Sequence, residues 1–354
     1  MKIAHVAPFA PNRCGLYEAA RDMARADIYG GNDVYFVDAG ITVNGKREEA
    51  KIGAVDDRAG FKLVTAKHEL LNDADLIIMH TGINDSYLVR NQAPLIWVVH
   101  GRPLACFRPE RMNKSQSYSL YNTVASWKRT KGMLYFWKEF IPYWDGILHN
   151  KDIVLNNPVV DHFRFNNKKE KHVLQSKGEI NLLVCDSERE DIDLYEMVVG
   201  LIHAVKKYPG KMKIHFFGLD MPEGKLSNCW NLLLGQLKKY GGLGDVSGRI
   251  RNMENLYNAV DCLISPNRII TRTIAEALSC GVPVISQNNK MNYLSDYTCD
   301  MSDPEDITEA IGLFLEDKKN NAINSDNIKQ RASVFSLKTY SEQMKLIYQK
   351  ILSK

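Results

Sequence analysis

One pattern constrains the fold of this chain more than any other: short runs rich in Val and Ile alternate with stretches of helical spacing, and the series occurs twice. The runs lack strict alternation of apolar and polar residues, which is typical of strands buried on both faces of a parallel sheet. Strands that alternate with helices predict α/β units with right-handed crossovers. The apolar runs are residues 3–7, 34–37, 76–79, 96–99 and 146–148 in the first half, and 180–184, 213–217, 262–264 and 282–285 in the second.

The length of the chain also favours two domains, because 354 residues exceed the size to which one hydrophobic core usually grows. The stretch 166–178 is polar, charged and poor in apolar residues, so we predict the interdomain linker there. The sequence therefore predicts one α/β domain over 1–165, a second over 179–335, and a terminal helical segment over 336–354.

Composition excludes several classes of protein. Apolar residues make up 45% and charged residues 25%, as in soluble globular proteins, and no apolar run reaches the roughly 18 to 20 residues of a membrane span. The seven cysteines include no CxxC pair, so neither a zinc site nor a disulfide framework is predicted, and a reducing cytoplasm is the expected location. A net charge of +4 is too weak to identify an anionic partner.

The most informative stretch is 265–285, in which a strand ends at Pro266 and a helix begins near Thr271 to Thr273. Ligands of open parallel sheets bind outside the carboxyl ends of the strands. The unpaired N–H groups at this helix start, with Arg272 beside them, would suit a diphosphate. Glu276 lies one turn further along and could accept hydrogen bonds from ribose hydroxyls. The alternative is a surface salt bridge between Arg272 and Glu276 at i, i+4.

Other strand ends also carry polar groups. His80 and His100 follow the third and fourth apolar runs, and Arg102 comes two residues after His100. A histidine near its ordinary pKa of about 6.5 can move a proton or bind a sugar hydroxyl, although a lone histidine is more often structural. The loop after the first run carries Cys14-Gly15-Leu16, where a glycine at a loop-to-helix turn lets backbone approach a ligand or merely makes a tight connection.

Charge is concentrated in residues 101–150, which hold eight Lys and Arg against three acids and are rich in aromatic residues. Basic residues interleaved with aromatic ones, such as Trp127-Lys128-Arg129, are what a phosphate backbone and a displaced base require. The alternative is a pair of helices that packs its aromatic residues inward and exposes a basic face.

Residues 265–285 resemble the donor-binding signature of the large retaining family of GT-B glycosyltransferases that includes sucrose and glycogen synthases. Glu276 and the run Gly281-Val282-Pro283-Val284 match the signature, whereas Arg268 stands where the family has a first glutamate and Thr271 where a glycine is usual. The resemblance implies two Rossmann-like domains facing a cleft, with the acceptor in 1–165 and the nucleotide sugar in 179–335. It also implies that 336–354 returns to the first domain, and that transfer requires no metal or other cofactor.

The same resemblance implies roles for individual residues. His100 matches the family's cleft histidine and becomes the expected catalytic residue. The expected donor site has Arg189, Arg272, Thr271 and Thr273 on the phosphates, Glu276 on the ribose, and Arg249 and Ile250 on the base. The expected acceptor or sugar contacts are Cys14, Gly15, Leu16, His80, Arg102, Trp127, Lys128 and Arg129.

A weaker resemblance links Arg189, residues 270–276 and His100 to the phage DNA glucosyltransferases. We therefore predict transfer of a sugar from a nucleotide-sugar donor, a UDP-sugar, to a hydroxyl group, with hydroxymethylated cytosine in double-stranded DNA as the acceptor. A glycan or lipid-linked acceptor stays open, as does a GT-B-like protein that binds sugar nucleotides without transferring sugar. Retention and inversion of the anomeric centre both stay open. An NAD-dependent enzyme is disfavoured because no GxGxxG motif follows a first strand.

Overall fold

The computed structural model describes residues 1–7, 15–38, 41–43, 46–48, 63–65, 73–80, 93–100, 130–145, 152–156, 158, 171–186, 192–218, 225–248, 250, 253–290 and 293–353. The chain forms two compact units. Unit 1 comprises Met1–Val160 and Val334–Lys354, and unit 2 comprises Asp161–Ser333.

Unit 1 is built on a seven-stranded sheet in the order β5-β2-β1-β6-β7-β8-β9, with every neighbouring pair parallel. The strands are β1 (Lys2–Ala7), β2 (Asp33–Asp38), β5 (Leu63–Thr65), β6 (Leu76–Met79), β7 (Leu95–Val99), β8 (Thr130–Tyr135) and β9 (Asp152–Val154). The strands predicted from the first four apolar runs are confirmed. The sequence pattern did not predict β8 and β9, and residues 146–148 lie outside the described residues.

A short antiparallel pair, β3 (Ile41–Val43) and β4 (Lys46–Glu48), completes the described strands of unit 1. Its helices are α1 (Gly15–Tyr29), α5 (Ile141–Asp145) and α12 (Leu337–Leu352), with a 3-10 turn at Lys138–Phe140.

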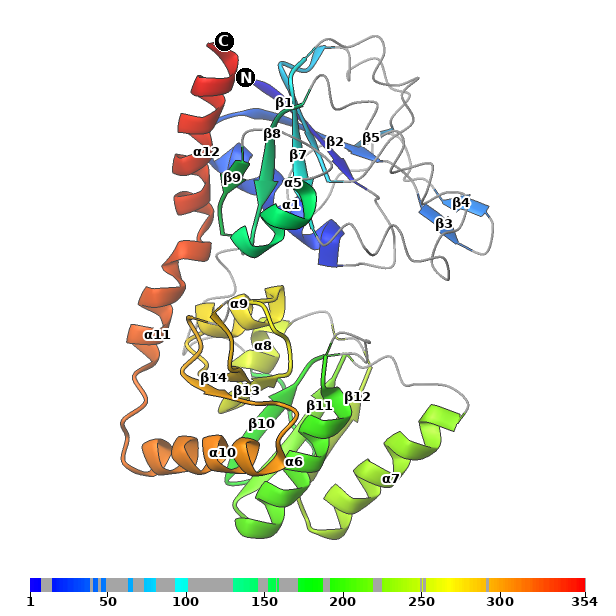
Figure 1. Cartoon of the computed structure of the whole chain (residues 1–354), viewed down its shortest axis with the longest axis vertical. Coiled ribbons are helices and arrows are strands. Elements are labelled where there is room, and N and C mark those ends of the chain that lie inside the picture. The colour runs from blue at the N-terminus through cyan, green and yellow to red at the C-terminus, as the bar shows by residue number, and fades with distance from the viewer. Residues whose placement is uncertain are drawn as a thin grey trace. The chain divides into compact units, whose positions relative to one another are not determined.

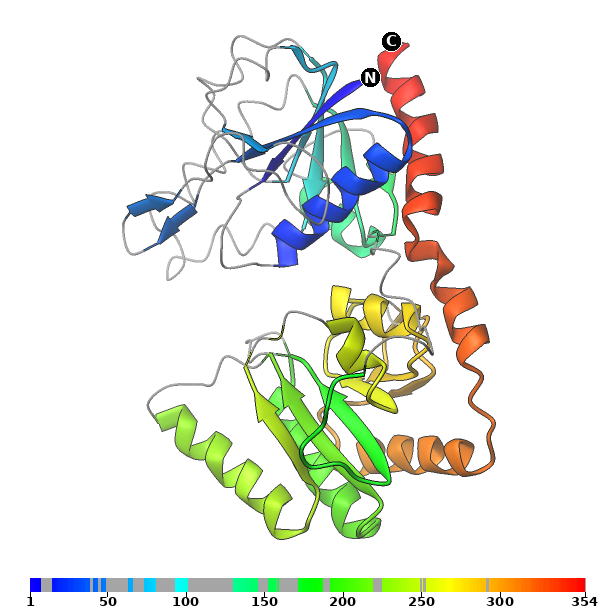
Figure 2. The ribbon, with the colours of Figure 1, turned by 180° about the vertical axis from the view of Figure 1, so that it is seen from behind.

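The last helix of the chain belongs to unit 1. Figures 1 and 2 both show α12 alongside α1, and Met23 of α1 shares a buried core with Tyr340 and Met344 of α12. Gly30, just after α1, permits the close approach, because a Cβ atom there would lie 2.5 Å from Oγ of Ser341. The predicted return of the terminal helix to the first domain is confirmed.

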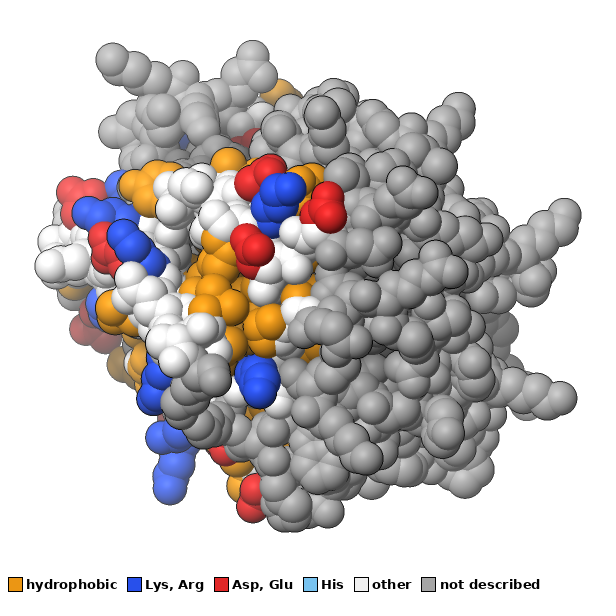
Figure 3. Space-filling view, turned by 90° about the horizontal axis from the view of Figure 1, so that it is seen from above, with side chains coloured by type: hydrophobic (Ala, Val, Ile, Leu, Met, Phe, Trp, Pro, Cys, Tyr) orange, Lys and Arg blue, Asp and Glu red, His pale blue; other side chains and the backbone are white. Residues whose placement is uncertain are grey.

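The two chain termini lie at the same end of unit 1 (Figure 1). In the coloured part of the view onto this end, Lys and Arg side chains alternate with Asp and Glu around apolar groups (Figure 3). Strand β1 begins here, and the backbone N–H of Lys2 donates to the Asp75 carboxylate at 2.8 Å. This mixed surface lies at the amino ends of the strands, whereas ligands of such sheets bind at the carboxyl ends.

Unit 2 is built on a six-stranded parallel sheet in the order β12-β11-β10-β13-β14-β15. This order, 3-2-1-4-5-6 in chain sequence, is that of a dinucleotide-binding Rossmann sheet, and its direction reverses between β10 and β13. The strands are β10 (Ile180–Val184), β11 (Met212–Phe217), β12 (Leu243–Ser247), β13 (Cys262–Ser265), β14 (Val284–Gln287) and β15 (Tyr297–Cys299). The four strands predicted in the second half are confirmed, and β12 and β15 are two further strands that the sequence pattern did not predict.

The helices of unit 2 are α6 (Leu194–Lys207), α7 (Lys225–Lys239), α8 (Met253–Tyr257), α9 (Arg272–Ser279), α10 (Pro304–Lys319) and α11 (Ser325–Arg331), and a 3-10 turn at Ala332–Phe335 follows α11. Buried side chains of α6 and α10 pack with those of β10 and β11 in one core. None of the helices in the described parts of the chain is long and apolar enough to cross a membrane.

Candidate functional site

Helix α9 of unit 2 begins just beyond the carboxyl end of β13, where the sequence predicts a ligand site. Thr271 caps the helix, since its side-chain oxygen accepts a hydrogen bond from the Ile274 N–H at 3.5 Å. The helix ends in a Schellman motif: the N–H of Gly281 donates to the carbonyl of Leu278, and the N–H of Val282 donates to the carbonyl of Ala277. Gly281 has φ of 78°, a conformation that only glycine adopts readily. Both ends of α9 are therefore fixed by local sequence.

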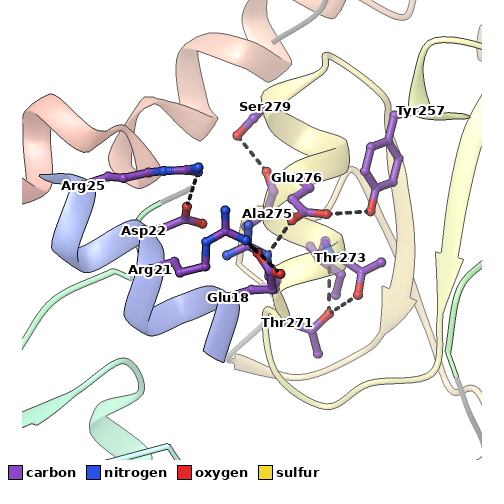
Figure 4. Close-up of polar contacts among 12 residues, drawn as sticks. Glu18, Arg21, Asp22, Arg25, Tyr257, Thr271, Thr273, Ala275, Glu276 and Ser279 are labelled. Atoms are coloured by element: carbon purple, nitrogen blue, oxygen red, sulfur yellow. Dashed lines mark hydrogen bonds and ion pairs between the residues drawn. The ribbon is translucent and has the colours of Figure 1, made fainter. Parts of the chain in front are cut away.

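Glu276 is buried on α9 between two donors (Figure 4). Its Oε1 lies 2.6 Å from Nε of Arg272, and its Oε2 accepts a hydrogen bond of 3.1 Å from the Tyr257 hydroxyl. The i, i+4 ion pair considered as an alternative does form. It is not a surface pair, however, because the Glu276 side chain is only 7% exposed and that of Arg272 only 17%. Burial and the nearby Glu276 carboxylate raise the pKa of Tyr257 well above its usual value, so this phenol remains a donor.

A second buried polar cluster joins the ends of β10 and β13. Ser265 donates its hydroxyl proton to the Asp186 carboxylate at 2.8 Å, and the side-chain amide of Asn267 donates to the other oxygen of the same carboxylate. All three residues are at most 7% exposed. The cluster fixes the first residues of the loop that leads from β13 into α9.

Two carboxylates influence the thiol that follows β10. Burial raises the pKa of Cys185 well above its usual value, and the negative charges of Asp186 and Glu276 add to the effect. The carboxyl end of β10 and the first turns of α9 therefore form one electrostatic environment. A thiol held neutral here is not a nucleophile.

Arg268 departs from the family pattern, and the structure shows what it does. Its side chain is 59% exposed, and its guanidinium lies 3.4 Å from the carboxylate of Asp193, at the start of α6. The loop before α9 thus presents a cation where the resembling enzymes present a glutamate.

The structure brings together part of the expected donor site. Thr271, Arg272, Thr273 and Glu276 all lie on the first turns of α9, and the Thr271 hydroxyl lies 3.4 Å from that of Thr273. Ile250 is half-buried beyond β12. The remaining expected donor residues, Arg189 and Arg249, lie outside the described residues.

Unit 1 holds a different arrangement at the carboxyl ends of its strands. His80 follows β6 and His100 follows β7, and Nδ1 of His80 lies 3.1 Å from Nε2 of His100. On its other side, Nε2 of His80 lies 3.1 Å from Nδ1 of His5, within β1. The rings of His5 and His80 stack with their centroids 5.4 Å apart. The two predicted histidines therefore contact each other directly, and a third, His5, extends the series on the other side of His80.

The histidine series continues to a buried acid. Nε2 of His5 lies 2.8 Å from the Asp27 carboxylate, which also accepts hydrogen bonds of 2.8 and 2.9 Å from the Tyr348 hydroxyl. Burial lowers the pKa of His100 to about 4 and that of His80 well below its ordinary value. Both imidazoles are therefore neutral at neutral pH.

Sequence reasoning missed His5, Asp27 and Tyr348, and it also missed the Asp186 cluster. One signal was available: His5 interrupts a strand whose other inner positions are all apolar, and such a buried imidazole needs a polar partner. Likewise Asp186 comes two residues after β10, a buried strand that is apolar apart from Asn181.

The expected acceptor residues are described only in part. Gly15 and Leu16 open α1, whereas Cys14, Arg102, Trp127, Lys128 and Arg129 lie outside the described residues. Within the described segment 130–145, four aromatic residues are buried: Tyr135, Phe136, Phe140 and Trp144. Those four side chains belong to the packed interior and are not available to stack on a base, although Tyr135 lies in strand β8 and not in the pair of helices that the alternative assumed.

Comparison with known proteins shows the fold. No protein-family model and no curated protein matches the sequence. Among the solved structures that match is HepE of Anabaena in complex with UDP and glucose, with a TM-score of 0.69, 12% identity and coverage of 99% of both chains.

Two further matches cover the chain equally well. The pneumococcal O-GlcNAc transferase GtfA, in complex with UDP and GlcNAc, has a TM-score of 0.68 at 12% identity and covers 100% of this chain and 99% of its own. An alpha-glucosyltransferase in complex with UDP and a 13-mer DNA containing an HMU base has a TM-score of 0.64 at 12% identity over 100% of both chains. The chain has the GT-B fold, as the resemblance implies.

Proposed function

We propose that this chain is a glycosyltransferase that moves a sugar from a UDP-sugar to a hydroxyl group of an acceptor. The observation that carries the proposal is the start of α9, where Thr271, Arg272 and Glu276 stand at the reversal point of a Rossmann sheet. Similar folds in which UDP is bound, such as HepE and GtfA, support the choice of donor.

The diphosphate is proposed to lie at the start of α9. The first N–H groups of an α-helix have no partner within the helix, and the helix dipole favours an anion there. The hydroxyls of Thr271 and Thr273 add donors beside these groups. Arg272 and Arg189 would supply guanidinium groups, which bind phosphate oxygens in pairs.

The ribose is proposed to bind Glu276. A diol that donates to this carboxylate would take the place of the Arg272 guanidinium, now 2.6 Å away, and let that cation turn toward the phosphates. The Tyr257 hydroxyl, which donates to the other carboxylate oxygen, would hold Glu276 in position during the exchange. The base is proposed to meet the backbone at Arg249 and Ile250.

In the transfer step, the bond between the anomeric carbon and the β-phosphate oxygen breaks, and the acceptor oxygen bonds to that carbon. The leaving diphosphate gains negative charge, which the α9 start and Arg272 would stabilise. His100 of unit 1 is proposed to bind the donor sugar or to accept the proton of the acceptor hydroxyl. A neutral imidazole suits both tasks.

For the acceptor, we propose the hydroxymethyl group of a modified pyrimidine in DNA. The basic character of 101–150 supports this choice, as does the similar alpha-glucosyltransferase that was crystallised with DNA containing an HMU base. Acceptor contacts are proposed at Cys14, Gly15, Leu16, His80, Arg102, Trp127, Lys128 and Arg129.

The test is a set of reactions with UDP-glucose, UDP-galactose, UDP-N-acetylglucosamine and a GDP-sugar. Each is offered hydroxymethylated duplex DNA, the unmodified duplex, an oligosaccharide or a lipid-linked sugar, and released UDP and glycosylated product are measured. We expect UDP release that depends on the hydroxymethylated duplex. Product on another acceptor would overturn the DNA proposal alone. UDP binding without release or transfer in any reaction would overturn the enzymatic proposal.

A further inference from the structure

Five polar residues of unit 1, four of them buried, form one continuous chain of hydrogen-bonded contacts. They come from α12, α1, β1 and the ends of β6 and β7, so the chain crosses the unit from its last helix to the carboxyl edge of its sheet. The members in order are Tyr348, Asp27, His5, His80 and His100. The first four are at most 3% exposed.

Asp27 determines the direction in which the hydrogen bonds between the histidines run. An ionised carboxylate only accepts hydrogen bonds. Burial and the nearby Asp27 raise the pKa of Tyr348 well above its usual value, so the phenol stays protonated and donates to Asp27. His5, whose Nε2 lies 2.8 Å from the same carboxylate, must therefore carry its proton on Nε2.

The direction then passes from ring to ring. A neutral imidazole protonated on Nε2 has a lone pair on Nδ1, so Nδ1 of His5 accepts a hydrogen bond from Nε2 of His80. The same rule makes Nδ1 of His80 the acceptor for Nε2 of His100. His100 is left with its own lone pair on Nδ1.

With His5 neutral, the reverse assignment is unfavourable. It would set the lone pair of His5 Nε2 against a carboxylate oxygen at 2.8 Å, between side chains that are at most 1% exposed. A buried acceptor that faces another acceptor lacks the donor it needs, and the loss is larger when one of the two is charged. An imidazolium at His5 would donate from both nitrogens and leave His80 and His100 protonated on Nδ1, so the position of the proton on His100 also distinguishes the two charge states of His5.

We propose that Asp27 acts as a positioning residue which, through His5 and His80, fixes His100 as the Nε2–H tautomer and so presents its Nδ1 as a hydrogen-bond acceptor. The chain of three contacts at 2.8, 3.1 and 3.1 Å carries this inference. Only its last consequence, that the acceptor atom receives a hydroxyl of the donor sugar or of the acceptor, rests on the proposed glycosyltransferase function.

The tautomer can be measured without substrate. In the full-length protein labelled with 15N-histidine, the nitrogen chemical shifts and one-bond N–H couplings distinguish a protonated Nε2 from a protonated Nδ1. The His100 signals are assigned from the variant His100→Gln. We expect the wild type to show His100 protonated on Nε2 at pH 7. A proton on Nδ1 of His100 would overturn the proposal, and the tautomer itself is read in the wild-type protein.

The variant Asp27→Asn tests the relay itself. An asparagine amide can donate to Nε2 of His5, which would move the protons of all three rings to Nδ1 and place a donor where His100 presents an acceptor. We expect at least part of the His100 population to change tautomer. An Asp27→Asn protein that folds with His100 entirely in the wild-type tautomer would overturn the relay.

The matched control is His215→Gln, which removes a buried histidine of unit 2. The His215 ring lies between the Asn181 side chain and the backbone N–H of Asp245. The variant therefore loses hydrogen bonds comparable to those of His5 and His80, and none of them belongs to unit 1. We expect no change in the His100 signals. A tautomer change in this control would show that His100 responds to any loss of stability, and would overturn the specific relay.

Kinetics separate this inference from the proposed function. If the wild type transfers sugar, Asp27→Asn should lower kcat by at least about tenfold while KM for the UDP-sugar changes less than threefold, because the proposed contacts to the nucleotide lie in unit 2. If KM rose in Asp27→Asn by the same factor by which kcat fell, the result would contradict a positioning role. A protein with the expected tautomer and no transferase activity would contradict the proposed function and still support the relay.

Discussion

The two units place opposite kinds of polar chemistry on equivalent edges of similar sheets. In each unit the central strands run in the order 3-2-1-4-5, and polar side chains follow the strands at their carboxyl ends. In unit 2 these are the carboxylates Asp186 and Glu276, with Arg272 at a helix start. In unit 1 they are the neutral imidazoles His80 and His100.

In both units, the sheet therefore determines where a site lies, and the buried residues in contact with the strand-end side chains determine its chemistry. In unit 2 nearby donors hold the carboxylates in place, as the Tyr257 hydroxyl holds Glu276. Arg272, paired with Glu276 and partly exposed at the helix start, makes this site suitable for an anionic ligand. In unit 1 a distant acid orders uncharged rings in series, which suits a hydroxyl or a proton. Each contrast can be tested with a variant.

Removal of the Glu276 carboxylate should break the unit 2 site. Glu276→Ala loses the bonds to Arg272, to Tyr257 and, as proposed, to ribose, and we expect UDP affinity measured by calorimetry to fall about 10- to 100-fold, as the loss of one hydrogen bond to a charged group implies. The control Glu309→Ala changes an exposed acid of α10 and should leave affinity unchanged. Full affinity in Glu276→Ala would refute the ribose assignment.

Loss of the Asp186 carboxylate should destabilise unit 2 and spare unit 1. Asp186→Ala leaves Ser265 and Asn267 without their common acceptor in the interior, and we expect the free energy of unfolding of unit 2 to fall by about 2–4 kcal/mol. Hydrogen exchange resolves the two units separately. A similar loss of protection in both units, or a change in unit 2 below about 0.5 kcal/mol, would contradict the role of the cluster.

Acid should weaken unit 1 more than unit 2. Folded unit 1 keeps His80 and His100 neutral, whereas the unfolded chain protonates them near pH 6.5, so unfolding takes up protons and stability falls as the pH drops from about 6.5 toward 4. Unit 2 has one described histidine with a lowered pKa, His215, and a nearby Asp245 opposes that shift.

Denaturant unfolding at pH 7 and pH 5, followed by hydrogen exchange, measures this contrast. His100→Gln should flatten the pH dependence of unit 1, and His203→Gln, at an exposed position of α6, should not. A pH dependence in His100→Gln as steep as in the wild type would show that another group causes the acid sensitivity.

The smallest expected effect concerns the anchor of the last helix. Tyr348→Phe removes the hydroxyl that donates to Asp27 and leaves the ring in the core, so unit 1 should lose about 1–2 kcal/mol of stability while nucleotide binding by unit 2 stays unchanged. A urea titration measures the first quantity and calorimetry with UDP the second. An unchanged urea midpoint would mean that the hydroxyl contributes nothing to the anchor.

Local sequence predicted the features that local physics determines. The dense Val and Ile runs identified the buried strands. Gly281 marked the end of α9, because glycine adopts a positive φ at little cost and other residues do not. Strand β8, with the sequence Thr-Lys-Gly-Met-Leu-Tyr, lacks that apolar signal and was missed. Its burial comes from neighbouring strands and not from its own composition.

The sites were harder to predict because their partners are distant in sequence. Glu276 and Arg272 lie one turn apart on one helix, so spacing alone suggested their pairing. The contact between Tyr348 and Asp27 spans 321 positions, and that between Asp186 and Ser265 spans 79. Residue type can indicate that a buried His5 or Asp186 needs a partner, but only the folded chain shows which one.

The central claim is that the start of α9 holds the diphosphate of a nucleotide, and it is tested by calorimetry with UDP and with uridine on the wild type and Arg272→Ala. Uridine keeps the base and ribose and lacks the diphosphate. The wild type should bind UDP at least about 100-fold more tightly than uridine, and Arg272→Ala should weaken UDP binding by about tenfold or more without weakening uridine binding. Equal affinity of the wild type for the two ligands would contradict the account.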